Sequence, residues 1–520
     1  MNRSKWLHVG EVLGVNAANY PDKLGWQDRK KEFTFSQWND RARRFANGLQ
    51  SLGVGFQERF GVISYNRGEW MDFYAGCAKG GQVIVPIMFR LAGPEIEYIV
   101  NHSECKCMIV ESPFVELIDS IKKRLPAKTY IYLGDGPTPE GYIAYEDMLQ
   151  ESSPLEPAGK TSGEDVWHIM YTSGTTGRPK GVVRTHEATM AHYMLSSINM
   201  AVRPTDKVML VMPMCHVNSI FYSFPYSLLT APVFIYDKPS FDPADLLGCI
   251  DTYRITFTSL VPTHYSMLLD LPDEIKGKAD VSSVRQLLIS SAPASRQLKL
   301  AIMEYFSNAE LWEAYGCTEG GLATMLRPED QFKKLGSIGR EAFGVDRIKL
   351  LDADRREVGD EEVGELFYRG PCIFKEYLKD RQKTEEAFEG EWFSAGDMAV
   401  RDSEGYYTLV DRKANMIITG GENVYPSEVE NVLRSHPAVR EAAVIGVPDS
   451  KWGEAIKAVI VVNDGFEAGE ALGREIIESC RGSIAGYKLP KSVEFIKEQD
   501  MPRTATGKIL HRVIKGRFSG

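Results

Sequence analysis

Apolar residues up to about residue 300 repeat with two different spacings, one typical of helices and the other of strands. Residues 36–52 carry their apolar side chains at helical spacing, at Trp38, Ala42, Phe45, Leu49 and Leu52. We expect a helix there that begins at Ser36, whose hydroxyl suits an N-cap, and that ends at Gly53. The runs 60–65 and 83–87 are short and apolar, which predicts strands. Because the two patterns alternate, the sequence predicts βαβ units and a largely parallel sheet.

The pattern changes at about residue 336. From there to 411, short strands alternate with turns, as in GELFYRG and GYYTLVDR, which is typical of antiparallel structure. Beyond Arg412 we predict helices over 426–436 and 469–481 and strands over 442–447 and 457–462. About 105 residues of this kind are enough for one small α+β domain, and we place its boundary at residues 411–415.

Composition and charge exclude several classes of protein. The 520 residues are 43% hydrophobic and 25% charged, which is ordinary globular usage and excludes disorder of the whole chain. Lys and Arg number 61 against 71 Asp and Glu, a net charge of −10, so we expect no broad binding to nucleic acid or anionic lipid. We see neither a secretion signal nor the roughly 18 uninterrupted apolar residues of a membrane span. Eight cysteines without a CxxC pair predict reduced thiols in a cytoplasmic protein.

The strongest local signal is a hydroxyl-rich glycine turn at residues 171–186, YTSGTTGRPKGVVRTH. The apolar run before it predicts a strand, so the turn leaves the carboxyl end of that strand. Glycines let the backbone approach an anion, and hydroxyls and a lysine supply donors and positive charge. It is not a Walker A loop, because Lys180 follows Pro179 and not a glycine. A plain flexible linker is the alternative, which the flanking strand and Pro179 disfavour. The predicted polyphosphate site comprises Thr172, Ser173, Gly174, Thr175, Thr176, Gly177 and Lys180.

This turn resembles the signature of the acyl-adenylate-forming superfamily, which includes acyl-CoA synthetases, nonribosomal peptide adenylation domains and beetle luciferases. Further motifs follow in the family's order along almost the whole chain, and the wording DRxxNMI…GGENV is closest to the carnitine and crotonobetaine CoA-ligase branch. The resemblance implies an α/β fold: a large multi-layer domain 1–411 with two mostly parallel sheets flanked by helices and a small antiparallel β subdomain. A hinge at 412–415 and a small mobile α+β domain 416–520 would follow.

Two segments further along resemble the family's nucleotide site. In EAYGCTEGG, residues 313–321, Tyr315 would stack on the purine, Thr318 would contact a phosphate and Glu319 would bind Mg²⁺. The alternative for Glu319 is a polar surface turn, and for Asp397 and Arg412, which match the ribose-binding pair, a surface salt bridge. Many relatives have glycine where this chain has Ser290 and Ser291 in SSAP. The full predicted nucleotide set is Ser291, Ala292, Pro293, Glu313, Ala314, Tyr315, Gly316, Thr318, Asp397 and Arg412.

The C-terminal segment PRTATGKIL, residues 502–510, resembles the segment that carries the family's catalytic lysine, here Lys508. A lysine that reaches both the carboxylate and the α-phosphate would offset their repulsion during adenylation; the alternative is an ordinary basic tail. Gly420 and Gly421 would let the pantetheine arm of coenzyme A pass close to the backbone. Ala414 occupies the hinge position where relatives usually have Asp or Lys, which leaves its capping interactions open.

His216 occupies the place of an aromatic or histidine gate beside the acyl carbonyl; the alternative is a core histidine. Phe221, Tyr222 and Phe224, with residues 259–268, would line an apolar acyl pocket, although aromatic residues at such positions are more often core. We therefore expect a medium-chain, branched, alicyclic or aromatic carboxylic acid as the substrate.

The sequence thus predicts an acid–CoA ligase that uses ATP, Mg²⁺ and coenzyme A, with Thr172, His216, Glu319 and Lys508 as catalytic residues. Acyl-AMP and pyrophosphate would form first, and coenzyme A would then displace AMP. The alternatives are a stand-alone enzyme that loads a carrier protein, a luciferase-like oxygenase, and a sensor of ATP or acyl-AMP without turnover. We expect a monomer or homodimer whose partners are these small molecules.

Overall fold

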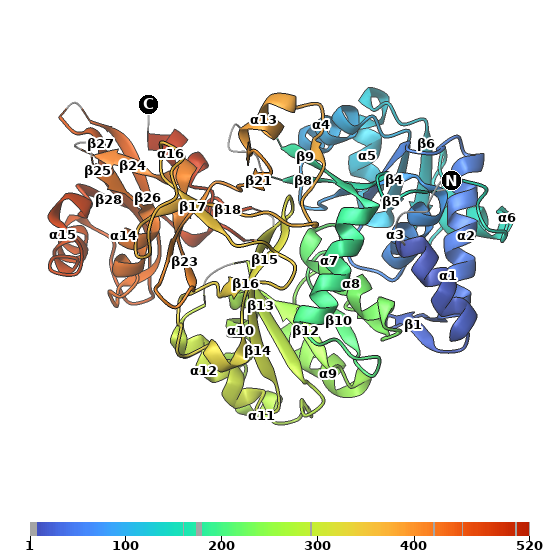
Figure 1. Cartoon of the computed structure of the whole chain (residues 1–520), viewed down its shortest axis with the longest axis horizontal. Coiled ribbons are helices and arrows are strands. Elements are labelled where there is room, and N and C mark those ends of the chain that lie inside the picture. The colour runs from blue at the N-terminus through green and yellow to red at the C-terminus, as the bar shows by residue number, and fades with distance from the viewer. Residues whose placement is uncertain are drawn as a thin grey trace. The chain divides into compact units, whose positions relative to one another are not determined.

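The chain folds into two compact units, shown in a computed structural model that describes residues 8–159, 161–172, 179–291, 294–419, 422–449, 451–504 and 507–518 (Figure 1). Unit 1 comprises Met1–Gly174, Pro179–Arg347 and Tyr368–Phe393. Unit 2 comprises Thr175–Arg178, Ile348–Phe367 and Ser394–Gly520. The domain boundaries inferred from the sequence, at 411 and 416, stay a prediction.

Unit 1 contains an eight-stranded sheet that is mostly parallel. Neighbouring strands from β8 to β7 run parallel, and the hairpin β8–β9 and the short β19 add antiparallel strands at one edge. In spatial order the strands are β19 (Glu376–Tyr377), β9 (Lys180–Thr185), β8 (Val166–Thr172), β4 (Val83–Ile87), β3 (Arg59–Ile63), β5 (Cys107–Glu111), β6 (Thr129–Leu133) and β7 (Ile143–Ala144).

A second sheet of nine strands belongs to the same unit. It is parallel from β14 to β1 and antiparallel at both edges. Its order is β16 (Arg340–Glu341), β15 (Gly321–Leu326), β14 (Glu310–Cys317), β13 (Gln286–Ser290), β12 (Phe257–Leu260), β10 (Val208–Leu210), β11 (Val233–Ile235), β1 (Leu24–Gln27) and β2 (Glu32–Thr34). Two mostly parallel sheets confirm this part of the predicted fold.

Alternate residues of these strands face two different cores, because side chains leave a strand on opposite faces. In β5, Cys107 and Ile109 belong to one core while Met108 and Val110 belong to another. In β13, Leu288 joins that first core while its neighbours join a third. The first core is therefore shared between the two sheets, and each sheet has its own outer core.

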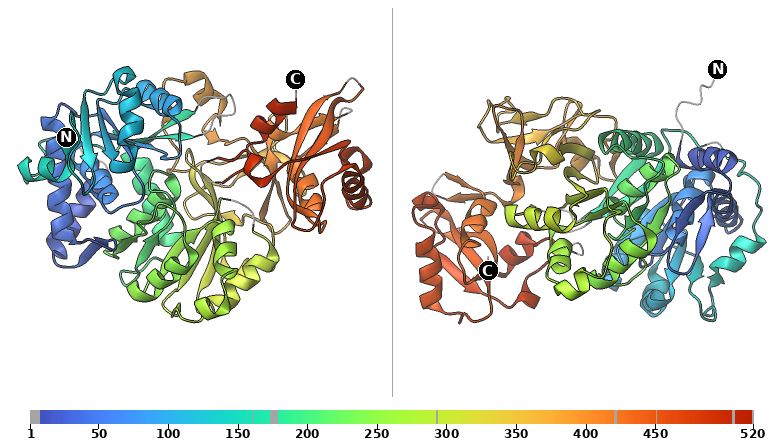
Figure 2. Two further views of the ribbon diagram at one scale, coloured as in Figure 1. Left: turned by 180° about the vertical axis from the view of Figure 1, so that it is seen from behind. Right: turned by 90° about the horizontal axis from the view of Figure 1, so that it is seen from below.

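Helices complete the layers on both sides of the sheets (Figures 1 and 2). The shared core includes side chains from α1 (Val9–Asn19), α2 (Phe35–Ser51), α3 (Glu69–Gly80), α6 (Tyr145–Glu151), α7 (His186–Asn199) and α8 (Val217–Leu228). The outer core of the eight-stranded sheet is covered by α4 (Gly93–Ser103) and α5 (Val115–Ile121). That of the nine-stranded sheet is covered by α9 (Pro243–Tyr253), α10 (Pro262–Leu269) and α12 (Arg296–Tyr305).

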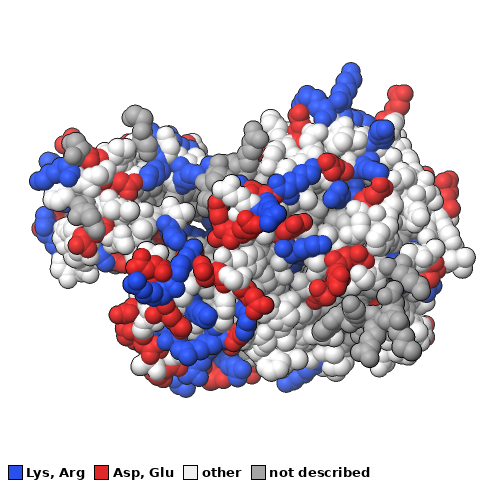
Figure 3. Space-filling model, turned by 45° about the horizontal axis from the view of Figure 1, so that its top comes forward, with Lys and Arg blue, Asp and Glu red and all other residues white. Residues whose placement is uncertain are grey.

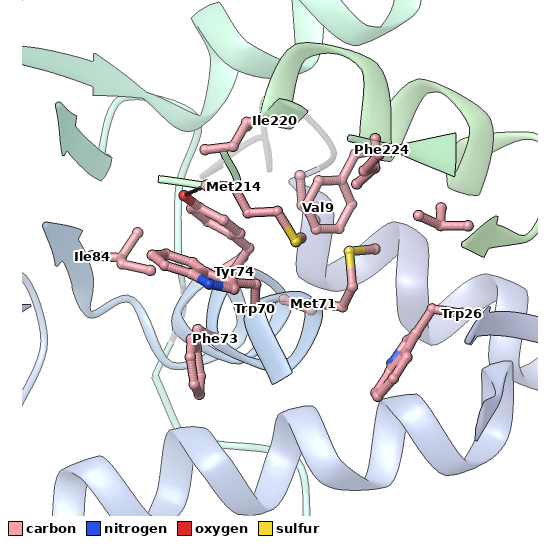
Figure 4. Packing of buried hydrophobic residues seen from close by; sticks show 14 of the residues in the cluster. Val9, Trp26, Trp70, Met71, Phe73, Tyr74, Ile84, Met214, Ile220 and Phe224 are labelled. Atoms are coloured by element: carbon pink, nitrogen blue, oxygen red, sulfur yellow. Dashed lines mark hydrogen bonds between the residues drawn. The ribbon is translucent and has the colours of Figure 1, made fainter. Parts of the chain in front are cut away.

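Large aromatic side chains fill the shared core (Figure 4). Phe224 of α8 packs against Tyr74 of α3 and Trp38 of α2. The Tyr74 hydroxyl donates a hydrogen bond of 2.8 Å to the carbonyl oxygen of Met214, so its burial leaves no polar atom unsatisfied. Phe221, Tyr222 and Phe224 all belong to this core, in agreement with the alternative that aromatic residues at these positions are core residues.

The helix predicted from Ser36 begins slightly earlier. Thr34, and not Ser36, is the N-cap of α2: its hydroxyl accepts from the Gln37 amide at 3.3 Å, and the Gln37 side chain accepts from the Thr34 amide at 2.9 Å. This reciprocal pair is a capping box, which satisfies two amides that the helix itself cannot. Gly53 follows the helix with φ of +85°, as expected of a glycine that ends a helix.

Unit 2 contains two sheets of its own. The antiparallel sheet predicted between 336 and 411 has the order β17 (Lys349–Leu351), β18 (Gly364–Phe367), β22 (Asp397–Arg401) and β23 (Tyr407–Arg412). The other sheet comprises β25 (Glu422–Val424), β24 (Ile417–Thr419), β27 (Gly453–Val462), β26 (Val439–Asp449) and β28 (Ser492–Phe495). Its helices are α14 (Pro426–Leu433), α15 (Glu470–Ser479) and α16 (His511–Phe518), so the predicted α+β character of this region is confirmed.

The charges on the surface are mixed, in agreement with the similar numbers of acidic and basic residues in the sequence. On the face in Figure 3, acidic and basic side chains are interspersed, with no extended field of one sign. Within the described ranges, no helix has both the length and the apolar character needed to cross a membrane.

Two histidines are buried in unit 1 without hydrogen bonds. His168 of β8 and His186 at the start of α7 are 0% and 1% exposed, and neither ring nitrogen of either residue has a hydrogen-bond partner in the part of the chain that is described. Burial holds the pKa of both imidazoles well below the ordinary value, and the charge of Arg184 lowers the pKa of His168 further. Both side chains are therefore neutral in the folded protein.

Replacing both residues, as His168→Gln with His186→Gln, is expected to flatten the acid side of the stability profile. An unfolded histidine takes up a proton below about pH 6.5 while these folded ones do not, so each costs up to about 1.4 kcal/mol of unfolding free energy per pH unit below that value. Urea unfolding at pH 5 to 8 measures this. Equal slopes for variant and wild type below pH 6.5 would show that the two imidazoles are charged when folded.

Candidate active site

The hairpin β8–β9 presents the two ends of the predicted phosphate turn. Thr172 is the last residue of β8 and pairs with Lys180, the first of β9. Strand pairing therefore fixes both residues at the mouth of the turn. Of the predicted set, Ser173, Gly174, Thr175, Thr176 and Gly177 lie outside the described residues.

Lys180 lies beside the predicted metal ligand through one tyrosine. The Lys180 ammonium is 4.1 Å from the centroid of the Tyr377 ring, a cation–π contact. The Tyr377 hydroxyl donates a hydrogen bond of 3.0 Å to Oε1 of Glu319. Tyr377 is itself fixed because β19 pairs with β9, with Tyr377 opposite Val182. The ammonium predicted to bind phosphate and the Glu319 carboxylate thus both contact one buried side chain, Tyr377.

The main chain around Glu319 is held by a buried arginine. Arg184 of β9 is 0% exposed and donates to the carbonyl oxygens of Thr318 at 2.8 Å and Glu319 at 3.2 Å. Its other terminal nitrogen donates to the carbonyl of Cys372 at 2.7 Å. Burial lowers the pKa of this guanidinium, which nevertheless stays charged because arginine starts so high. One cation therefore ties the 318–319 turn and residue 372 to the strand that carries Lys180.

The last part of β14 requires glycine at position 316. A Cβ on Gly316 would lie 2.1 Å from the carbonyl oxygen of Gly321, so the two strands β14 and β15 could not approach as they do. The register shifts between Tyr315 and Gly316, a bulge of the kind that re-aims side chains near functional sites. Ala314 and Tyr315, both half-buried, precede this bulge. Their contacts with a nucleotide stay a prediction.

Glu313 has a partner that the sequence motif did not indicate. Its carboxylate accepts a hydrogen bond of 2.5 Å from the ammonium of Lys299 in α12, and both side chains are buried. Burial raises the pKa of Glu313 although Lys299 opposes the change. The pair holds α12 against β14, the strand that leads to Tyr315. The Glu313 side chain therefore keeps this strand in position.

His216 and the SSAP segment both lie at the N-terminal end of α8. His216 is the N-cap of that helix, and its Nδ1 accepts from the Asn218 amide at 3.3 Å. The Asn218 side chain donates to the Ser290 hydroxyl at 3.0 Å, which joins α8 to the end of β13. Ser291 follows with φ of +72°, a left-handed conformation that suits the glycine of many relatives better than serine. Ala292 and Pro293 lie outside the described residues.

In unit 2, the predicted ribose pair is brought together. Asp397 of β22 and Arg412 of β23 face each other in the strand register, and the Arg412 Nε lies 2.5 Å from the Asp397 carboxylate. Arg412 also donates to the carbonyl of Ala395 at 3.1 Å. Lys508 belongs to the same unit and stands in a turn between residues 502 and 510. Gly420 and Gly421 lie outside the described residues.

The residues present fit a magnesium ion that is shared with a nucleotide. Within the described part of the chain no cluster of three or more His, Cys, Asp or Glu side chains could hold a metal by itself. Mg²⁺ does not need one, because it is commonly held by one or two carboxylates together with substrate phosphates and water. Glu319, with one oxygen already oriented by Tyr377, supplies such a carboxylate.

Four residues of the site were not selected from the sequence: Arg184, Asn218, Lys299 and Tyr377. A charged residue within the apolar strand KGVVRT was a signal for Arg184. The other three stand in segments with no distinctive spacing, and only their contacts identify them.

Comparison with known proteins covers the whole chain. Residues 13–378 match the family described as AMP-binding enzyme, and residues 428–508 match the AMP-binding enzyme C-terminal domain. A long-chain-fatty-acid–CoA ligase of Mycobacterium tuberculosis is 36% identical over 519 residues, which cover 98% of this chain and 99% of the relative.

Solved structures show the same fold. An anthranilate–CoA ligase in complex with anthranoyl-AMP matches with a TM-score of 0.88 at 29% identity, covering 99% of this chain and 98% of that one. An o-succinylbenzoate–CoA synthetase of Bacillus subtilis, in complex with ATP and a magnesium ion, matches with a TM-score of 0.83 at 26% identity, covering 96% and 98%.

Tyr377→Phe is expected to raise the Mg²⁺ concentration for half-maximal pyrophosphate release about tenfold, since loss of a group that orients a metal ligand commonly costs that much. The ring remains, so the contact with Lys180 is kept. Tyr305→Phe removes a comparable hydroxyl, one that donates to the Lys276 carbonyl at 3.0 Å, and is the control. An unchanged Mg²⁺ dependence in Tyr377→Phe would show that the hydroxyl does not orient Glu319.

Proposed function

The chain belongs to the AMP-binding enzyme family and is an AMP-forming acid–CoA ligase, and from that premise we propose which residues carry each step and which acids it activates. The assignment rests on the match of both family regions along this chain. The matched chain contains a lysine at the phosphate turn (Lys180), a buried carboxylate (Glu319) and a C-terminal lysine (Lys508). The substrates are a carboxylic acid, ATP with Mg²⁺, and coenzyme A.

In the first half reaction, a carboxylate oxygen attacks the α-phosphorus and pyrophosphate leaves with the electrons of the broken P–O bond. We assign Thr172 and Lys180 to the phosphates, where a hydroxyl and an ammonium offset the charge of the triphosphate. Glu319 would hold Mg²⁺, which supplies further charge neutralisation when bound. We assign Lys508 to the repulsion between the attacking carboxylate and the α-phosphate, a task that only a cation reaching both can perform.

In the second half reaction, the thiol sulfur of coenzyme A attacks the acyl carbonyl and AMP leaves. AMP is a good leaving group where the oxide of a free carboxylate is not, which is why adenylation comes first. We assign the path of the pantetheine arm to Gly420 and Gly421, and the entrance to the carbonyl to His216. Asp397 and Arg412 are assigned to the ribose, since their pairing across β22 and β23 sets a carboxylate and a guanidinium side by side.

We propose a medium-chain, branched, alicyclic or aromatic acid as the substrate. The support comes from similar proteins, two of which are named for a long-chain fatty acid and for anthranilate. Phe221 and Tyr222 of α8, which the sequence placed at the pocket, belong to the same buried core as Phe224. A cytoplasmic location is also proposed, because all eight cysteines are described and none forms a disulfide. A monomer or homodimer remains the proposed state.

A panel of acids tests the substrate proposal. Coenzyme A-dependent thioester formation is expected to be highest with hexanoate, cyclohexanecarboxylate, phenylacetate or a branched acid of similar size. Acetate should be lower by at least tenfold in kcat/KM, since each buried methylene contributes about 1 kcal/mol or more of binding. Acetate strongly preferred over every larger acid would refute the proposed class, while leaving the ligase assignment intact.

Lys508→Ala should separate the half reactions. Pyrophosphate release is expected to fall by about a thousandfold, because the cation that offsets the developing charge is gone. Thioester formation from supplied acyl-AMP and coenzyme A should keep most of its rate, since that step has no triphosphate. Stopped assays of each half reaction measure both. Equal losses in the two steps would contradict the role assigned to this lysine.

A further inference from the structure

The turn that carries Lys508 is closed by its own hydrogen bonds. The Thr504 amide donates to the Lys508 carbonyl at 2.7 Å, and the Lys508 amide donates to the Thr504 hydroxyl at 3.1 Å. Arg503 donates to the Gly507 carbonyl at 3.0 Å. These bonds fix the shape of the turn. These bonds do not fix its place on unit 2, because their partners lie between residues 502 and 510. Arg503 also pairs with Glu441 of β26, and this contact ties the turn to unit 2 at one point.

The helix that follows the turn holds it at a second point. Ile514 of α16 is buried in a small core with Ile445 and Met501, and Ile509 packs against the same core. At the first residue of α16, His511 Nε2 lies 2.6 Å from Oε1 of Glu430 in α14. His511 is three residues from the lysine, and its partner is 81 positions away in the sequence. The contact therefore ties the lysine turn to a distant helix.

Glu430 is a fixed anchor for this contact. Its side chain is 6% exposed and accepts from the Val444 amide of β26 at 2.9 Å and from the Arg434 guanidinium at 3.0 Å. The carboxylate is thus bound to α14 and β26 independently of the tail. His511 therefore contacts a Glu430 carboxylate whose position is already fixed by other hydrogen bonds.

The charges around His511 favour its protonated form. Burial alone would lower the pKa of the imidazole, but the hydrogen bond and charge of Glu430 outweigh burial and raise the pKa above the ordinary value. Asp411 at the end of β23 adds to this effect, and Arg434 opposes it. A histidine whose pKa is raised on folding contributes fully below about pH 6.5 and loses that contribution as the pH rises through the raised value.

We propose that His511 is a positioning residue for Lys508: its contact with Glu430 holds the C-terminal end of the turn 502–510 against α14, while Arg503 pairs with Glu441 of β26, and the His511 contact thereby helps set where the lysine ammonium stands for adenylation. This rests on the adenylation role proposed above for Lys508. The second half reaction does not use that ammonium and does not depend on the contact.

Three variants of the full-length enzyme test the proposal at pH 6 to 9. His511→Gln should lower the kcat of acyl-AMP formation roughly tenfold, the effect of losing a charge-assisted hydrogen bond, while the KM for ATP stays within about twofold. Thioester formation from supplied acyl-AMP should not change. His511→Arg keeps a positively charged donor, so the variant should retain adenylation. In wild type, part of the fall in adenylation rate with rising pH should come from deprotonation of His511, and this part should be absent in His511→Arg.

His436→Gln is the matched control. His436 also lies in unit 2, 3.6 Å from the Glu475 carboxylate, and accepts from the Ala438 amide at 3.2 Å, but it stands on the chain after α14 and not on the tail. It should leave both half reactions unchanged. Hydrogen exchange of residues 507–511 should accelerate in His511→Gln and not in His436→Gln, which reports the position of the turn without any catalysis.

The outcomes separate this inference from the function it rests on. If Lys508→Ala abolishes adenylation but His511→Gln leaves adenylation and exchange unchanged, the positioning role is wrong and the ligase mechanism stands. Equal loss of both half reactions in His511→Gln would likewise overturn it, by showing a general effect on folding. If Lys508→Ala retains adenylation, the function proposed for the lysine fails first.

Discussion

Unit 1 depends on one apolar layer that two sheets share. Because side chains alternate across a strand, residues such as Ile109 and Leu288 meet in this layer while Met108 and Ile289 turn to the outer cores. Strands covered on both faces are mostly apolar along their length. A buried polar side chain within such a strand, such as Arg184 of β9, needs partners for its donors. The predicted site residues lie near strand ends, at the hairpin β8–β9 and at the bulge between Tyr315 and Gly316 in β14.

Within that frame, functional side chains are held by contacts between segments far apart in the sequence. Arg184 binds carbonyls at 318, 319 and 372, and Tyr377 joins the strand of Lys180 to the carboxylate of Glu319. A buried guanidinium is costly unless its donors are used, so its contacts define one arrangement of these segments far better than apolar packing could. Lys180, at the described end of the phosphate turn, and Glu319, the predicted metal ligand, are therefore linked through Arg184 and Tyr377.

In unit 2, the positively charged residues of the predicted site, Arg412 and Lys508, are also held by contacts with other residues. Asp397 meets Arg412 through strand pairing, whereas Lys508 stands on a short turn whose place is set by neighbours. The two lysines to which we assign a role thus differ in support. Lys180 begins a paired strand and lies over an aromatic ring, whereas the turn of Lys508 is held by the Arg503–Glu441 pair and by the apolar contacts of Ile509.

The sequence by itself determined the α/β class and several individual elements, such as the helix α2, the strands β3 and β4 and the helices α14 and α15, because apolar periodicity is a local property of the chain. The N-cap of α2, Thr34, was missed by only two residues. Tertiary structure alone decided that Lys299 meets Glu313, that Arg184 binds main-chain carbonyls and that His511 meets Glu430. Carbonyls are the same at every residue, and a partner 81 or 134 positions away leaves no pattern in the sequence.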